Sequence, residues 1–315
     1  MGRPRGTYSI VAFDPATGAH GVAVQSHWFS VGSMCSWARP GVGAVATQSF
    51  VQPAFGPRAL DAMAGGADAS GALEAVLAGD DVTPLRQVGI VDSRGGVVAH
   101  TGDGCIAEAG HVLGEHWSCQ ANMMASETVP AAMSAAFGAA TGDLAARMMA
   151  ALEAAERAGG DVRGRQSAAL LVVPAGGEPW QTTVDLRVED HDDPLAELRR
   201  LLTLQHAYSL AGEGDELMAT GRDEDAAQCY LRAAELAPDA AELAFWAGLA
   251  MAQAGDLAGG SAAVERVAAI HPGWLTLLER LPAGLAPSAP AIRAVLESHR
   301  LNKSAESVAI RTPNS

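Results

Sequence analysis

The chain of 315 residues changes character close to Asp193. Before this point, short runs rich in β-branched residues alternate with turn residues and a few alanine-rich stretches. After it, the sequence is rich in Ala, Leu, Glu and Arg with helical periodicity. We therefore predict a mixed domain over residues 1–204, a helical module over 205–280, and a poorly ordered or helical tail over 281–315.

The first domain is predicted to contain hairpins interleaved with helix pairs. The apolar run from Tyr8 to Phe13, the turn residues Asp14-Pro15 and a second run from Gly21 to Ser26 predict a hairpin at its start. Further strands are expected at 42–48, 87–92, 97–100, 117–120, 168–173 and 183–188, and helices at about 129–137 and 144–158 and after Gly56-Pro57. Blocks of strands separated by helices favour α+β layers over a doubly wound parallel sheet.

The second part contains an internal repeat. Gly221 and Gly255 are 34 residues apart, and so are Pro238 and Pro272. This period, with small residues in the helices and a Pro that ends each unit, is typical of tetratricopeptide repeats. Because only about two units are present and roughly three are needed for independent stability, we expect the module to lean on the first domain or on a copy of itself.

Charge and cysteine content exclude several classes of protein. With 36 acidic and 21 basic residues the net charge is −15, which repels phosphate, so we expect no nucleic-acid partner. No run approaches the ~20 apolar residues of a membrane span, and the N-terminal sequence lacks the apolar region of a signal peptide. The 4 cysteines form no CxxC pair and suit a reducing compartment. We therefore expect a cytoplasmic protein that does not contact membranes.

The order of motifs in the first domain resembles the N-terminal nucleophile (Ntn) hydrolases. In these enzymes a Thr, Ser or Cys begins the first strand of a hairpin, as Gly6–Ala12 (GTYSIVA) and Gly21–Val24 (GVAV) suggest here. The segment Gln87–His100 resembles the proteasome-subunit hairpin before a glycine-rich loop, and Ser118–Met123 takes the place of that loop. Gly160–Ser167 stands where proteasome subunits carry an Asp followed by Ser-Gly-Gly.

The resemblance is closer to an uncharacterised bacterial family placed in the Ntn superfamily. Its members share the motifs TYSIVA, GVAV, GVGAVATQ, RQVG, AHTG, GNM and GRQSAALLVV. The chain carries all of them in order from Thr7 to about Leu204, with Ala121 in place of the usual Gly of GNM.

This resemblance implies a four-layer αββα sandwich with an active site at one end of its two sheets. Thr7 would be the nucleophile, and its own free α-amine, with a reference pKa of about 7.7–8.0, the general base. Backbone N–H groups near Gln48-Ser49 or Gln120-Ala121 would stabilise the oxyanion. Asp161 and Ser167 would orient the amine.

The implied substrate is a small linear or cyclic amide, cleaved without a cofactor. Arginines near the expected rim, Arg39, Arg58 and Arg165, would suit a substrate carboxylate. Because domains of this fold usually assemble, we also expect a homo-oligomer. The residues expected to bind substrate are Ser26, His27, Gln48, Ser49, Arg58, His100, Asp103, Gln120, Asn122, Arg165 and Gln166.

Two features depart from the proteasome pattern. Proteasome-type sites use a lysine at the start of the third strand, whereas the single lysine of this chain is Lys303. Six residues, Met1 to Gly6, precede Thr7, so a free amine requires cleavage of the Gly6–Thr7 bond. Glycine permits the strained geometry of an N-to-O acyl shift, which makes this bond a candidate autoproteolysis junction.

Other histidine, cysteine and acidic residues that could suggest a metal site or a nucleophile are expected to have structural or surface roles. His111 and His116, with Glu115 between them, could suggest a metal, but they lie in a hairpin-like stretch and we expect polar surface. Cys35 and Cys119 have no neighbour that would lower a thiol pKa, so we expect small buried residues. The acidic run 189–193 is expected to be a solvated linker, so we predict no metal site.

Two functions remain open from the sequence. The first is an Ntn-type amidohydrolase that uses Thr7 after removal of residues 1–6. The second is a non-catalytic scaffold of the same fold, in which the helical repeats bind a helix or peptide of a partner protein.

Overall fold

The computed structural model describes residues 6–310, and their side chains as far as residue 302. Most of the predicted leader, residues 1–5, and the last five residues of the tail lie outside this range. The chain forms two compact units, Met1–Leu202 and Thr203–Ser315, and the boundary falls within one long helix, α6 (Pro194–Ala219). Each unit is described separately below.

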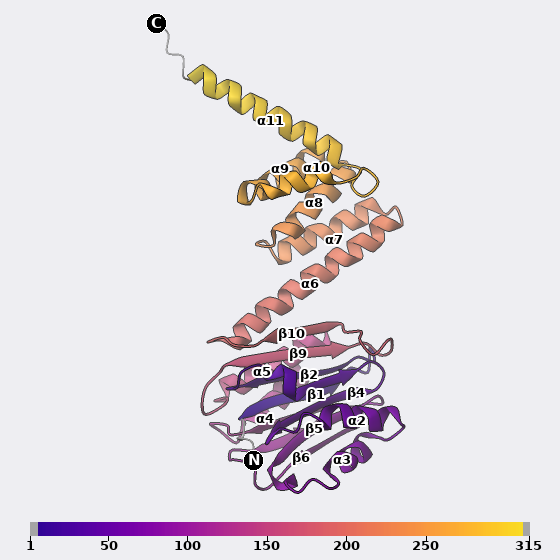
Figure 1. The fold of residues 1–315 in the computed structure, drawn as a ribbon, viewed down its shortest axis with the longest axis vertical. Coiled ribbons are helices and arrows are strands. Elements are labelled where there is room, and N and C mark those ends of the chain that lie inside the picture. The colour runs from indigo at the N-terminus through magenta and orange to yellow at the C-terminus, as the bar shows by residue number, and fades with distance from the viewer. Residues whose placement is uncertain (1–5, 311–315) are drawn as a thin grey trace. The chain divides into compact units, whose positions relative to one another are not determined.

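The first unit contains a six-stranded antiparallel sheet with the strand order β10-β9-β2-β1-β8-β7. Figure 1 labels the first four of these strands, which follow one another in that order. The predicted hairpin supplies its centre, because β1 pairs with β2 on one side and with β8 on the other. The strands are β1 (Thr7–Phe13), β2 (His20–Ser26), β7 (Gly110–Leu113), β8 (Trp117–Asn122), β9 (Ser167–Val173) and β10 (Val184–Val188).

A second sheet of four antiparallel strands has the order β3-β4-β5-β6. Sequence analysis predicted the inner strands but missed the four-residue strand β3, because a short run with Trp and Arg carries no clear period. The strands are β3 (Ser36–Arg39), β4 (Gly43–Ser49), β5 (Arg86–Asp92) and β6 (Val97–Thr101).

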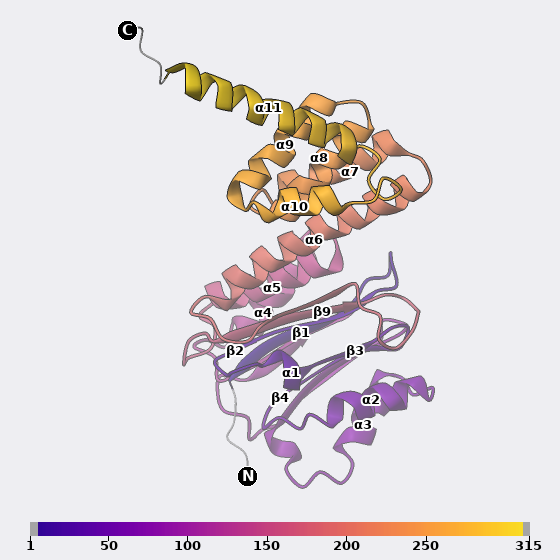
Figure 2. The same cartoon turned by 45° about the horizontal axis from the view of Figure 1, so that its top comes forward.

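Helices cover the outer faces of both sheets. The helices α4 (Val129–Ala139) and α5 (Leu144–Arg157) pack on the six-stranded sheet in a core that includes Phe137. The helices α2 (Phe55–Ala64) and α3 (Ala69–Leu77) pack on the four-stranded sheet. Figure 2 shows the two helix pairs on opposite sides of the strands. The mixed α+β class with two antiparallel sheets is thereby confirmed.

The inner faces of the two sheets contact each other through small and branched apolar residues. Val11 and Val22 of the first sheet pack against Ala44, Ala46 and Val91 of the second, and all five are fully buried. Beyond this apolar centre, the inner faces of β1, β4, β5 and β8 carry buried polar side chains instead. Buried polar groups lower stability unless they are hydrogen-bonded, so a concentration of them needs an explanation beyond packing. We therefore expect a functional site at this end of the interface.

The second unit consists of helices, and the 34-residue period is visible in their starting points. Helix α7 begins at Asp223 and α9 at Leu257, with α8 between them. The backbones of α8 and α9 approach closely, since a Cβ at Gly260 would stand 2.3 Å from the carbonyl oxygen of Gly248. The helices after α6 are α7 (Asp223–Leu236), α8 (Ala241–Gln253), α9 (Leu257–Ile270), α10 (Gly273–Arg280) and α11 (Ala289–Ile310).

Among the described residues, no helix is both long enough and apolar enough to cross a lipid bilayer.

The packing of α4 on the sheet predicts a large stability effect for Phe137→Ala. Phe137 is fully buried, lies 5.1 Å from the Trp117 ring and carries the Arg147 guanidinium 4.3 Å above it. We expect its truncation to lower the free energy of unfolding by about 3–5 kcal/mol. Phe29→Ala, at a side chain 61% exposed, serves as the matched control and should change it by less than about 0.5 kcal/mol. Equal urea midpoints for the two variants would contradict this packing.

Candidate active site

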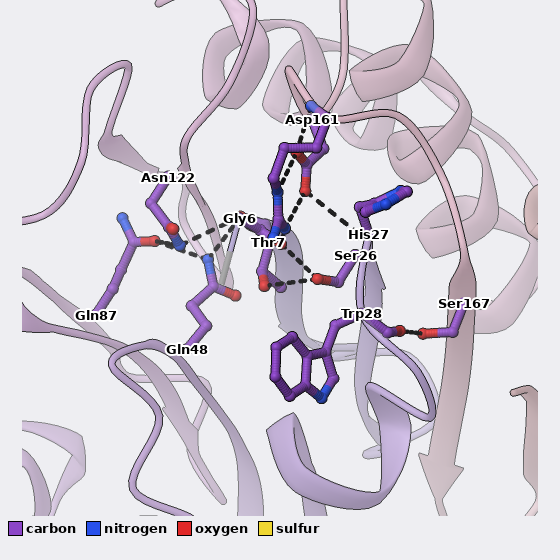
Figure 3. A network of polar contacts seen from close by, with 11 residues as sticks. Gly6, Thr7, Ser26, His27, Trp28, Gln48, Gln87, Asn122, Asp161 and Ser167 are labelled. Atoms are coloured by element: carbon purple, nitrogen blue, oxygen red, sulfur yellow. Dashed lines mark hydrogen bonds and ion pairs between the residues drawn. The ribbon is translucent and has the colours of Figure 1, made fainter. Parts of the chain in front are cut away.

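Four polar residues form one row across the six-stranded sheet. In the register, Thr7 of β1 stands opposite Ser26 of β2 and Asn122 of β8, and Ser26 stands opposite Ser167 of β9. All four are fully buried, and Figure 3 labels them among the polar contacts of the site. Directly opposite residues of an antiparallel sheet project to the same face, so the pairing itself gathers these side chains.

The peptide bond between Gly6 and Thr7 lies at the centre of this row. The Thr7 hydroxyl donates to the Ser26 hydroxyl oxygen at 3.2 Å. The Gly6 carbonyl oxygen accepts a short hydrogen bond from the Ser26 hydroxyl and a second one from Nη2 of Arg163 at 3.0 Å. Two donors, one of them charged, are therefore directed at the carbonyl that adjoins the Thr7 hydroxyl, as an oxyanion site requires.

Asp161 and Arg163 form one rigid pair next to Gly6. The Arg163 guanidinium donates to both carboxylate oxygens of Asp161, at 3.1 and 2.8 Å, and the Asp161 carboxylate also accepts the backbone N–H groups of Arg163 and His27. The approach is so close that a Cβ at Gly6 would lie 2.6 Å from the Asp161 carboxylate and 2.9 Å from Arg163. Glycine is therefore the residue that fits before Thr7.

A buried amide network ties the row to the second sheet. The Gln48 side-chain amide donates to the Thr7 carbonyl oxygen at 3.1 Å and to Oε1 of Gln87 at 2.7 Å. Oε1 of Gln87 also accepts from Asn122 at 3.0 Å. On the other side, the Ser9 hydroxyl donates to Oε1 of Gln48 and accepts from the Gln120 amide. The Thr7 carbonyl is thus bound by Gln48 of β4 and Asn122 of β8, and Gln87 of β5 links these two side chains.

The strands that carry this network end in unusual backbone conformations. Ser49, directly after Gln48, has φ 65°, and Met123, directly after Asn122, has φ 60°. Non-glycine residues seldom adopt this left-handed region, and such positions cluster at functional sites. Oδ1 of Asn122 is buried and has no hydrogen-bond partner in the structure, so it can accept a bond from a ligand.

Tyr8 and Glu156 form a second buried pair on the opposite face of β1. The Tyr8 hydroxyl donates to Glu156 at 2.8 Å. Burial, followed by the charge of Glu156, raises the pKa of Tyr8 well above its ordinary value, so the phenol stays protonated. Arg165 forms ion pairs with Glu156 at 3.4 Å and with Asp193 at 3.1 Å.

Several residues expected at the site are brought together by the structure. Ser26 and Asp161 contact Gly6, Thr7 or their partners, and Gln48, Gln120 and Asn122 belong to the amide network. His27 follows Ser26 and bonds to Asp161 through its backbone. The Ser167 hydroxyl instead donates to the Trp28 carbonyl and accepts from the Val31 N–H, so it holds the loop after β2.

Other expected residues bond elsewhere. Arg58 is exposed on α2, and His100 on β6 contacts the Thr83 carbonyl. Gln166 donates to Asp190, and Arg165 is engaged by two carboxylates. Asp103 lines a separate hollow of about 400 Å³ formed by residues 101–111.

Sequence analysis missed three residues of the site, Arg163, Gln87 and Ser9. The prediction selected Arg165, two residues further along in the same motif, instead of Arg163. A signal was present, because an Asp-x-Arg turn lets the arginine fold back on its own aspartate. Gln87 shares no local pattern with Gln48, and the two meet only through the pairing of β4 with β5.

The described residues include no group of three or more His, Cys, Asp or Glu side chains placed to hold a metal ion. His111 and His116 have different partners, the Thr101 hydroxyl and the Gly95 carbonyl. Cys35 and Cys119 are buried, and burial raises the pKa of Cys119, which keeps it from acting as a thiolate.

Comparison with known proteins places the chain in a family. Residues 7–198 match a family of unknown function, DUF1028. The chain belongs to this family. Residues 214–255 match a TPR repeat, which confirms the tetratricopeptide prediction for the helical part.

A solved structure of the same family resembles this DUF1028 chain. It is the crystal structure of SPO2555 from Silicibacter pomeroyi, which is 32% identical in sequence with a TM-score of 0.58. The match covers 62% of this chain and 84% of SPO2555. No curated protein matches the chain significantly.

The amide network of this DUF1028 domain predicts a large cost for Gln48→Leu. The change leaves the Thr7 carbonyl, Gln87 and Ser9 without their shared partner in a buried setting. We expect the free energy of unfolding in urea to fall by about 2–4 kcal/mol. The control is Gln166→Leu, whose single bond to Asp190 is exposed and which should cost less than about 1 kcal/mol. A Gln48 variant as stable as this control would argue against the network.

Proposed function

We propose that the protein is an Ntn-type amidohydrolase in which Thr7 becomes the N-terminal nucleophile. One observation carries the proposal: the Gly6 carbonyl, which adjoins the Thr7 hydroxyl, is held by the Ser26 hydroxyl and the Arg163 guanidinium. Two inner sheets with a helix pair on each outer face also suit the αββα sandwich that the sequence resemblance implies.

The first step is cleavage of the chain by its own threonine. Thr7 Oγ adds to the Gly6 carbonyl carbon, and the negative oxygen is stabilised by Arg163 and Ser26. The hydroxyl proton is transferred to the Thr7 nitrogen as the carbon–nitrogen bond breaks, while Ser26, which accepts from the Thr7 hydroxyl, keeps its own proton on the Gly6 oxygen. Water then hydrolyses the resulting Gly6 ester, which yields a Gly6 carboxylate and a free Thr7 amine and hydroxyl.

Cleavage also opens the site. Thr7 is fully buried while Gly6 is attached, and Gly6 fills the space beside Asp161 and Arg163. Once Gly6 leaves, the same donors face a substrate amide. The free amine of Thr7 then takes the proton of its hydroxyl as the hydroxyl attacks the substrate carbonyl.

Arg163 supplies the positive charge at the site in a domain that contains no lysine. A positive charge next to the nucleophile stabilises a developing oxyanion and favours the neutral form of the new amine. A guanidinium keeps its proton at every accessible pH, so the base in this scheme is the amine alone. The proposed substrate is a small amide, bound without a cofactor.

The proposed nucleophile predicts selective acylation of Thr7. A small β-lactone, which acylates activated hydroxyl groups, should add one acyl group to the purified protein at Thr7, as located by peptide mass spectrometry. Because the base is an amine whose reference pKa is about 7.7–8.0 and which Arg163 shifts downward, labelling should be about ten- to twentyfold slower at pH 6.5 than at pH 8.5.

The matched controls are Thr7→Ala, which should not be labelled, and Thr220→Ala, an exposed threonine of the second unit, which should be labelled like the unaltered protein. Labelling that persists in Thr7→Ala, or that is absent from both proteins, would contradict the assignment.

A second function, partner binding, is favoured by the TPR match over residues 214–255. Repeats of this kind present concave helical surfaces to other proteins. This function requires no catalysis by the first unit, and the chemistry of the helical surface determines which partner binds.

A further inference from the structure

The second unit contains a cavity of about 750 Å³ formed by its own helices. This volume lies within the range of roughly 300–1,000 Å³ that is typical of ligand sites. Helix α6 lines it with residues from Tyr208 to Ala219, and α8 with residues from Glu242 to Gln253. The lining residues recur every three or four positions, so one face of each helix is directed into the cavity.

The charged groups of this cavity are all acidic. Asp215, Asp223 and Glu242 line it, and no Lys, Arg or His does so among the residues that the structure describes there. Two of the carboxylates are held by tyrosines, since Tyr208 donates to Oε2 of Glu242 at 3.0 Å and Tyr230 donates to Oδ1 of Asp215. Each of these carboxylates keeps a second oxygen that can accept hydrogen bonds from a ligand.

Aromatic and apolar groups surround these acids. Tyr208, Tyr230 and Trp246 are the aromatic residues that line the cavity, and Met218 and Leu285 are among its apolar ones. Leu285 is 60% exposed, so apolar surface extends to the mouth of the cavity. Ring faces beside carboxylates attract a cation, and a planar guanidinium can stack on a ring while it forms paired hydrogen bonds to a carboxylate.

We propose that this cavity binds an arginine side chain presented by a peptide segment of a partner protein, with apolar neighbours of that arginine on Met218 and Leu285. The charge of the lining selects a cation, and the rings beside Asp215 and Glu242 favour arginine over lysine. The length of the two helix faces offers room for the residues on either side of the arginine. This inference rests on the helical unit and is independent of the chemistry at Thr7.

The test is calorimetric titration of the full chain with capped five-residue peptides. The probe carries a central arginine flanked by leucine and alanine, and its matched partners carry citrulline or lysine at the centre. Citrulline keeps the shape of arginine without its charge. We expect the arginine peptide to bind about tenfold more tightly than the citrulline peptide, with the lysine peptide between them.

Two variants localise the binding. Asp215→Asn combined with Glu242→Gln should weaken arginine-peptide binding about tenfold, because it removes two charges and keeps the side-chain shapes. Glu235→Gln, an exposed acid of α7 outside the cavity, should leave affinity within about twofold.

Several outcomes would overturn the proposal. These are equal affinities for the arginine and citrulline peptides, tighter binding of the lysine peptide, or no binding up to about 1 mM, the weak limit of specific recognition. Unchanged binding by the double variant would show that the peptide binds outside this cavity. If that variant fails to fold, the comparison of the three peptides on the unaltered protein still tests the proposal.

Discussion

The register of β1 between β2 and β8 fixes the whole candidate site. It aligns Thr7 with Asn122 and Ser26, and Ser26 with Ser167, so a slip of β1 by one residue would send Thr7 to the other face and separate it from the other three. The apolar contacts between the sheets and the helices on their outer faces resist such a slip. Stability and the placement of Thr7 therefore depend on the same pairing.

The electrostatics of the site centre on one arginine. Arg163 is bound to both oxygens of Asp161 and still reaches the Gly6 carbonyl. A carboxylate that is buried needs such a partner, and the partner is then held in place by it. The pair thus holds the Arg163 guanidinium at hydrogen-bond distance from the Gly6 carbonyl, and in the proposed mechanism this group stabilises the oxyanion.

Sequence reasoning could identify what is local or periodic. Short patterns in the sequence indicated the hairpin at Thr7, the motif that contains Asp161 and the 34-residue repeat. It could not choose Arg163 over Arg165, because that choice depends on which way the chain turns after Asp161. Nor could it pair Gln48 with Gln87 and Gln120, which come from three strands of two sheets. Contacts of this kind follow from sheet pairing and leave no periodic trace in the sequence.

The central claim is that the Gly6–Thr7 bond is broken by Thr7 itself. The most direct measurement is the intact mass of the purified protein beside that of Thr7→Ala. We expect the unaltered protein to lose residues 1–6 and begin at Thr7, whereas the Thr7→Ala protein should keep Gly6. An unaltered protein that retains Gly6, or a Thr7→Ala protein cleaved at the same bond, would contradict it.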